Sequence, residues 1–285
     1  MLWKTIISIC NCEALDIVFP TTRDQINEAV RGFTSISHQE AINNCVSVVD
    51  GFRFRIKTPS KKVIGNVRSF FSGHYQCCGV NVQAAVDHHS HFTYVAFAVP
   101  GVTQDRSAIR HCSLFKLIEA LPPGVCAIGD AAHDPTEHVV PVYYAVDRRK
   151  PLFDNFNFYA SQLCIRVEMA FGMMTRKWGV LQRPCTVNLS NATKMVQAIA
   201  RLHNYVIAER LLECGTEQEE GPRRGQISYL VSVPEDENGN PVRLDALFTG
   251  SFECHSELRQ RMAERVGRLQ LTRPVSNRLK SNSNG

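Results

Sequence analysis

The stretch Val125-Cys-Ala-Ile-Gly-Asp130 is an apolar run that ends in an acid. Its apolar part is too short for a helix and follows Pro122-Pro123-Gly124, so it predicts a buried strand. The same composition occurs upstream, where Cys45-Val-Ser-Val-Val-Asp50-Gly51 leads a second apolar run into an aspartate. The sequence therefore predicts two buried strands that each carry one carboxylate.

A third acid, Glu168, stands in Ile165-Arg-Val-Glu-Met-Ala-Phe-Gly172, among the apolar residues of a predicted helix. A glutamate in such surroundings needs either a partner or a function. Oxygen-rich, anionic sites suit Mg²⁺ or Mn²⁺, and a metal pair stabilises both the attacking and the leaving oxygen of an in-line displacement. Asp50, Asp130 and Glu168 are therefore the leading candidates for a metal-dependent phosphodiesterase site.

The two aspartates also have simpler structural explanations. Asp-Gly between apolar runs is the strongest short-range hairpin signal, so Asp50-Gly51 fits a turn equally well. Asp130 fits a loop acid that caps the next element, and Asp134 is a competing carboxylate nearby. These alternatives stay open on the sequence alone.

Basic residues cluster around the third acid: Arg166, Arg176, Lys177 and Arg183. Such a cluster can follow a phosphate backbone and is our candidate DNA-binding surface. An ordinary solvated helix face, with Arg166 or Arg176 paired to Glu168, explains the same residues. The region after residue 254 is also rich in arginine, which is typical of tails that contact nucleic acid.

Hydrophobic patterns predict the remaining elements. Strand-like runs cover 46–56, 78–86 and 92–99, with a turn at 87–90 that makes the last two an antiparallel hairpin. A short strand is expected at 141–144. Helices are predicted within 21–48 and at 105–121, 157–178, 191–212 and 256–269. Three strands, a helix, another strand and then helices is the order of an α/β, ribonuclease-H-like fold, a mixed sheet flanked by helices. In that fold Asp130 would lie near Asp50, at neighbouring strand ends.

Composition divides the chain into three expected segments. Residues 1–45 form a short helical lead-in, 46–212 form the ribonuclease-H-like domain, and 213–285 form a linker and a poorly structured basic C-terminal extension. The linker is predicted because 215–225 is charged and contains glycine, and because 234–241 is polar with proline at both ends.

Overall composition excludes several classes of protein. Apolar residues make up 44% and charged residues 21%, as in soluble globular proteins. The net charge is only +5, so any basic surface must be local. The eleven cysteines contain no Cys-x-x-Cys pair, which indicates free thiols rather than a zinc knuckle. No apolar run approaches the roughly 20 residues of a membrane span, so no membrane partner is expected.

Six short motifs lie between residues 41 and 212. In chain order they are Val49-Asp50-Gly51, Gly79-Val-Asn-Val-Gln-Ala84, Pro100-Gly101 with Asp105, Leu121-Pro-Pro-Gly124 with Gly129-Asp130, Val167-Glu168 with Ala170-Phe171-Gly172, and Leu202-His203-Asn204. In this order they resemble the catalytic domain of Harbinger-type DDE transposases and the nucleases domesticated from them.

The resemblance implies a divalent-cation-dependent DNA endonuclease. It also implies a location in the nucleus, with the cytoplasm as a second location. Asp50, Asp130 and Glu168 would be its catalytic triad, and Asp105, which otherwise fits a helix N-cap, a further metal-associated acid. Such proteins carry an N-terminal DNA-binding region, for which the segment before Asp50 is too short. We therefore expect a truncated copy that binds DNA mostly without sequence preference and uses a separate DNA-binding partner protein.

The chain departs from the family pattern beside each acid. Phe52-Arg53 replaces Thr-His, Ala131-Ala132-His133 replaces Ser-Gly-Tyr, and Met169 replaces Arg. Two hypotheses follow. The retained acids favour a nuclease or transposase, whereas the altered flanks favour a catalytically silent domain that binds DNA or a partner protein.

Overall fold

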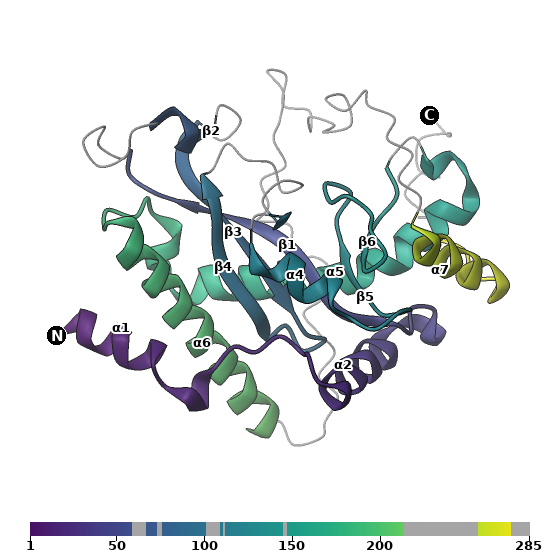
Figure 1. Ribbon diagram of the computed structural model, residues 1–285, viewed down its shortest axis with the longest axis horizontal. Helices are drawn as coiled ribbons and strands as arrows, with labels where there is room; N and C mark the ends of the chain where they lie inside the picture. The colour runs from purple at the N-terminus through teal and green to yellow at the C-terminus, as the bar shows by residue number, and fades with distance from the viewer. Residues whose placement is uncertain are drawn as a thin grey trace, which may run out of the picture.

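The computed structural model describes residues 1–58, 67–72, 76–100, 109–110, 112–144, 147–213 and 256–274. Within these ranges one six-stranded mixed sheet lies at the centre, with helices on both of its faces (Figure 1). The α/β, ribonuclease-H-like fold class predicted from the sequence is confirmed.

The strands, in chain order, are β1 Cys45–Arg55, β2 Phe71–Ser72, β3 Cys77–Val86, β4 Phe92–Pro100, β5 Cys126–Gly129 and β6 Val139–Pro141. β3 lies antiparallel between β1 and β4, and β5 and β6 continue the sheet parallel to β1 on its other side. The predicted hairpin of β3 and β4 is therefore confirmed. The last short strand lies a little earlier in the chain than the predicted 141–144.

β1 runs through Asp50-Gly51 without a turn, so the hairpin interpretation of this dipeptide is wrong. Asp50 has Ala84 as its partner in β3, and Gly51 has Gln83. Val48 and Val49 before the dipeptide and Phe54 after it are buried in one continuous strand, and its long-range pairing with β3 outweighs the local preference of Asp-Gly for a turn.

The helices are α1 Leu2–Cys10, α2 Arg23–Ile36, α4 Ser113–Glu119, α5 Pro151–Lys177, α6 Leu189–Glu213 and α7 Glu257–Arg268. Thr22 caps α2 in a capping box with Gln25, and Pro151 opens α5 at the position where a missing N–H costs nothing. α5 begins earlier than the predicted residue 157. The predicted start of the helix at Asp105 lies outside the described residues.

Alternate residues of the strands enter two separate cores. Cys126 and Ile128 of β5 face α5 and belong to the larger core, whereas Ala127 between them faces α4. In β1, Val48 belongs to the α5 side and Val49 to the α4 side. The side of the sheet to which each acid points therefore follows from its position in the strand.

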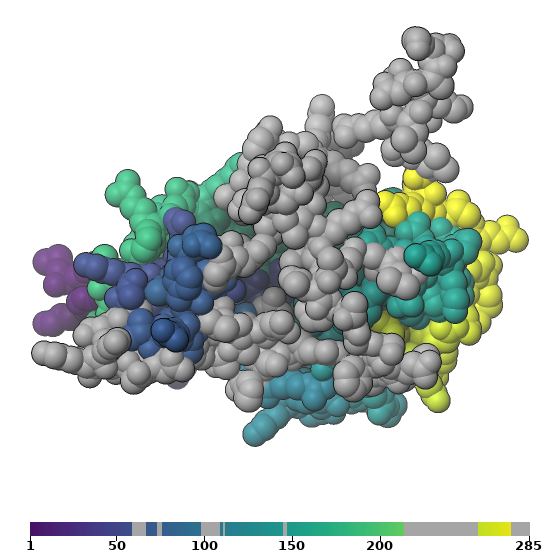
Figure 2. Space-filling model, turned by 90° about the horizontal axis from the view of Figure 1, so that it is seen from above, coloured from purple at the N-terminus to yellow at the C-terminus, as the bar shows by residue number. Residues whose placement is uncertain are grey.

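α7 closes one end of the larger core. Its apolar residues Leu258, Met262 and Val266 are buried. Figure 2 shows α7, in yellow, lying against the teal surface of the middle of the chain; its contacts are with α5 and β6. The division at residues 45 and 212 stays a prediction, although described parts of both outer segments pack on the sheet. No helix among the described residues is long and apolar enough to cross a membrane.

Candidate active site

Two of the predicted acids lie on neighbouring parallel strands. The last register pair of β1 and β5 is Val48 with Ile128. Asp50 lies two residues after Val48 and is still within β1. Asp130 lies two residues after Ile128 and is the first residue after β5. Both therefore continue the row of side chains that faces α5, since side chains alternate along a strand.

The third acid comes from α5, the helix that covers this face of the sheet. Glu168 lies one turn after Cys164, at the i, i+4 spacing that places two side chains on the same side of a helix. α5 packs against β1, β3 and β5, so this part of the helix lies over the strands that carry the aspartates. The topology thus brings the middle of β1, the end of β5 and one helix together.

The Cys164 thiol reports how close the three acids are. Burial raises its pKa well above the ordinary value, and nearby negative charges raise it further. These charges are, in decreasing order of effect, Asp130, Asp50 and Glu168. Because such effects fall off with distance, all three acids lie in the neighbourhood of one thiol. The sequence argument missed Cys164, although its spacing of four from Glu168 was visible.

His133 holds the carboxylate of Asp130. Its Nδ1 lies 2.8 Å from Asp130 Oδ1, which also accepts a hydrogen bond from the Ala132 N–H at 3.0 Å. Burial by itself raises the pKa of Asp130, but the hydrogen bond and charge of His133 outweigh burial, so its pKa is lower than usual. The imidazole is fully buried, whereas the carboxylate is 52% exposed. The protein thus favours the charged form of an acid that still reaches solvent.

Gly129 makes room for this histidine. A Cβ atom at Gly129 would lie 2.9 Å from His133 Nδ1 and 3.2 Å from Val49 Cγ2. The first distance is too short for a real contact, and the buried imidazole has little freedom to move away. The glycine of the Gly-Asp dipeptide is therefore required by His133. The sequence argument noted His133 only as a departure from the family pattern.

We expect Gly129→Ala to displace His133 and to lower the free energy of unfolding by about 1–3 kcal/mol, the usual cost of overpacking. Urea unfolding measures this change. Gly179→Ala is the matched control, because a Cβ atom there has no neighbour within 4 Å. Equal stability of the two variants would show that His133 is not held against Gly129.

Glu168 differs from Asp130 in its charge environment. Partial burial raises its pKa, and the negative charge of Asp130 raises it further. Within the described residues Glu168 forms no ion pair with Arg166 or Arg176. The ion-pair interpretation of this glutamate is therefore wrong for the structure as it stands, and its charge is opposed rather than neutralised.

A second departure from the family pattern anchors α5 beside β1. The Phe52 ring stacks on Phe171 with centroids 5.2 Å apart, and Phe92 of β4 contacts the same ring at 5.8 Å. Phe52 is two residues from Asp50, and Phe171 is three residues from Glu168. This aromatic contact therefore helps to fix the helix that carries Glu168 against the strand that carries Asp50.

The other candidate residues lie elsewhere or outside the described residues. Asp134, the competitor of Asp130, pairs with Arg110 at 3.1 Å. Asp105 lies outside the described residues.

Arg166 is half-buried, and the acid whose charge acts on it is Asp87 in the turn after β3. The exposed basic residues at the end of α5 and just beyond it are Arg176, Lys177 and Arg183.

As they stand, the side chains of the described residues form no group of three or more His, Cys, Asp or Glu that could hold a metal ion. The donor set nevertheless fits a hard divalent cation, because three carboxylates from different elements lie within electrostatic reach of Cys164. Mutual repulsion of like charges keeps such carboxylates apart when no cation balances them. Asp130 is exposed enough to turn.

A family model described as DDE superfamily endonuclease matches residues 49–204, more than half of the 285-residue chain. The chain belongs to this family. The match to the DDE endonuclease model begins one residue before Asp50 and contains all three acids. No curated protein and no solved structure matches the chain.

The DDE domain ends with a structural motif. His203 Nε2 lies 3.0 Å from the Ser90 carbonyl oxygen. The Asn204 side chain both accepts from the Phe92 N–H at 2.7 Å and donates to the Phe92 carbonyl at 2.8 Å. The Leu-His-Asn motif thus joins α6 to the first residues of β4.

Proposed function

We propose that this DDE domain is a Harbinger-type, divalent-metal-dependent DNA endonuclease with transposase-like chemistry. Its catalytic residues would be Asp50, Asp130 and Glu168, with Asp105 as a further metal ligand. The observation that carries the proposal is the placement of Asp50 and Asp130 on adjacent parallel strands, on the face of the sheet that α5, the helix of Glu168, covers. Family membership supports a nuclease that acts on DNA.

Mg²⁺ or Mn²⁺ is the cofactor that this donor set would hold. When bound, such a cation stabilises charge on the phosphate oxygens of a phosphodiester during displacement. Asp50 and Asp130 offer carboxylates from the sheet, and Glu168 offers one from the opposite side. Both hydrogen bonds to Asp130 use Oδ1, which leaves Oδ2 for a cation.

The chain's own residues would hold the three acids near one another before a cation binds. His133 orients Asp130, and the Phe52–Phe171 contact fixes the spacing of the sheet and α5. These contacts involve two of the three family departures, so the altered flanks support the site and do not by themselves favour a silent domain.

Substrate recognition in this proposal is largely electrostatic. The small net charge and the local basic residues support weak, salt-dependent DNA binding with little sequence preference. A separate DNA-binding protein would then direct the domain to its target, and a nuclear location follows from that role.

The test is whether a divalent cation stabilises the folded chain. Because a ligand that binds only the native state raises stability, we expect Mn²⁺ and Mg²⁺ to raise the Tm by an amount that grows with the logarithm of their concentration. Asp50→Asn and Asp130→Asn should lose most of this effect. Asp105→Asn should lose less if its main role is to cap a helix.

Asp134→Asn is the matched control, because Asp134 is already paired with Arg110. It should keep the full metal-dependent shift. Scanning calorimetry or dye-based melting, with and without EDTA, measures the shift for each variant. Equal shifts in the wild type and in the Asp50 and Asp130 variants would move the cation to another place. Mn²⁺-dependent nicking of supercoiled plasmid by the wild type then tests the reaction itself.

A further inference from the structure

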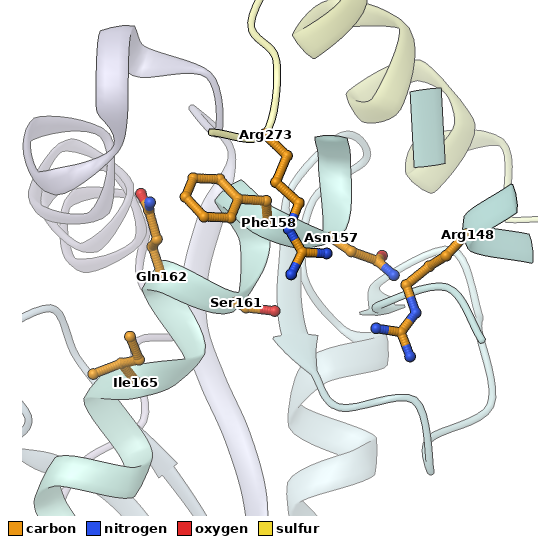
Figure 3. Close-up of a pocket in the computed structure, with 7 residues that line it drawn as sticks. All are labelled: Arg148, Asn157, Phe158, Ser161, Gln162, Ile165 and Arg273. Atoms are coloured by element: carbon orange, nitrogen blue, oxygen red, sulfur yellow. The ribbon is translucent and has the colours of Figure 1, made fainter. Parts of the chain in front are cut away.

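An open pocket with a volume of about 210 Å³ lies beside the N-terminal half of α5. Ser161, Gln162 and Ile165 of the helix line one side. Arg148 and Arg273, from segments far apart in the sequence, line the other, and Figure 3 shows both arginine side chains reaching toward the space beside Ser161. The pocket therefore combines two guanidinium groups with a hydroxyl and an amide.

Hydrogen bonds fix the two segments that carry the arginines. Asn157 accepts from the Tyr143 N–H at 2.7 Å and donates to the Tyr143 carbonyl at 2.8 Å. This pair holds the chain that leaves β6, four residues before the 3₁₀ turn Asp147–Arg149. On the other side, Tyr159 Oη donates to the Thr272 carbonyl at 3.1 Å, next to Arg273. Both arginines thus extend from anchored backbone.

One arginine is already paired and the other is not. Arg273 Nη1 contacts Asp154 Oδ1 at 2.9 Å, and its backbone N–H donates to Asn155 Oδ1 at 2.8 Å. Within the described residues Arg148 forms no ion pair. The residues that line the pocket include two arginines and no acid, and Asp154 pairs with Arg273, so the lining carries an excess of positive charge.

The pocket and the candidate active site share one face of α5. Ser161, Ile165 and Glu168 follow the i, i+4, i+7 spacing of a single helix face. Ser161 precedes Glu168 by seven residues, or about 10 Å along the helix axis at 1.5 Å per residue. Arg148 follows β6, whose carboxyl end lies at the same edge of the parallel strands as Asp130. A chain of phosphates that passes Glu168 could therefore reach the pocket.

We propose that Arg148, Arg273 and Ser161 bind a backbone phosphate of the DNA substrate. The bound phosphate would lie about three nucleotide steps from the acids, at roughly 3.4 Å per step. The inference rests on the proposed function, which it deepens by assigning a path for the substrate strand. Guanidinium groups suit phosphate because they donate paired hydrogen bonds in a fixed plane, and the serine hydroxyl adds a neutral donor.

The experiment measures binding of a short fluorescent DNA duplex to the full chain by anisotropy, in EDTA and over a series of salt concentrations. Arg148→Ala and Arg273→Ala should each weaken binding roughly three- to tenfold and reduce the slope of log K against log salt by at most about 0.9, the value for the one phosphate that they share. The affinity of Arg148→Lys should lie between that of the wild type and that of Arg148→Ala, because lysine keeps the charge but lacks the planar guanidinium group.

Arg261→Ala is the matched control, since this exposed arginine of α7 does not line the pocket. It should change affinity and slope less than the pocket variants do.

A second pair of variants avoids the structural role of Arg273. Ser161→Glu adds a negative charge to the pocket, whereas Ser35→Glu adds the same charge to an exposed position of α2. Unchanged Tm values identify the variants that can be compared.

Greater losses in the pocket variants than in their controls would support the assignment. Equal losses would show a general effect of net charge and would overturn it, as would a Ser161→Glu variant that binds like the wild type. Because binding is measured without metal, the result is independent of cleavage. A wild-type chain that fails to nick DNA refutes the proposed function, whereas nicking with indifferent pocket variants refutes only the phosphate site.

Discussion

Glu168→Gln is expected to abolish Mn²⁺- or Mg²⁺-dependent nicking. The substitution keeps the size of the side chain but removes the only acid that α5 contributes around Cys164. Loss of one charged group from a preorganised site typically costs about 3–4 kcal/mol of transition-state stabilisation, or two to three orders of magnitude in rate. Conversion of supercoiled to nicked plasmid, followed under single-turnover conditions, measures the loss.

Glu209→Gln is the control for this variant, because Glu209 is an exposed glutamate on α6. The two variants should have the same circular dichroism spectrum, and only Glu168→Gln should be inactive. Cleavage by Glu168→Gln at the wild-type rate would show that Glu168 takes no part in the reaction.

Stability without metal separates a catalytic from a structural role of the same residue. The pKa of Glu168 is raised by partial burial and by the charge of Asp130, so the folded protein disfavours its charged form. Neutralising it should therefore leave the Tm in EDTA unchanged or slightly higher. A residue held by an ion pair would behave in the opposite way, and its loss would lower the Tm.

Acid should destabilise the fold through His203. Burial lowers the pKa of this imidazole from 6.5 to about 4, although the hydrogen bond with the Ser90 carbonyl acts in the opposite direction. Below pH 6.5 the unfolded chain takes up a proton that the folded chain accepts only near pH 4. The unfolded state therefore binds more protons in this window, and stability falls as the pH falls. The shift corresponds to about 3 kcal/mol, lost between pH 6.5 and 4.

Urea unfolding of the wild type and His203→Gln at several pH values between 7 and 4 isolates this contribution. Glutamine can still donate to the Ser90 carbonyl but does not titrate, so the variant should show a flatter pH dependence. His38→Gln, at an exposed position, serves as control and should follow the wild type. Parallel curves for wild type and His203→Gln would mean that His203 is not buried as a neutral ring.

The sheet could be predicted from the sequence because its main strands are largely apolar. The runs that became β3 and β5 are buried on both faces, and a βα connection between parallel strands permits few arrangements. The hairpin alternative at Asp50-Gly51 could not be excluded locally. What decides the conformation there is pairing with β3, whose residues lie more than thirty positions away.

The acids of the candidate site could be selected from the sequence, but their surroundings could not. His133 looked like a departure from a motif, and only its contact with Gly129 explains why the two residues occur together. Arg148 and Arg273 are 125 positions apart, and no periodic pattern connects residues from two such segments. Their convergence depends on where α7 returns the chain to α5.

The late position of α7 affects how the chain is made. The buried residues of α7, together with Leu271 just beyond it, complete the core beneath α5. Leu271 lies 58 positions after Glu213, where α6 ends. At roughly 5–20 residues per second, a ribosome needs about 3 to 12 s to add that stretch. During this time the nascent sheet and α5 exist without their last apolar cover. The need for chaperones is therefore greatest between synthesis of α6 and synthesis of α7.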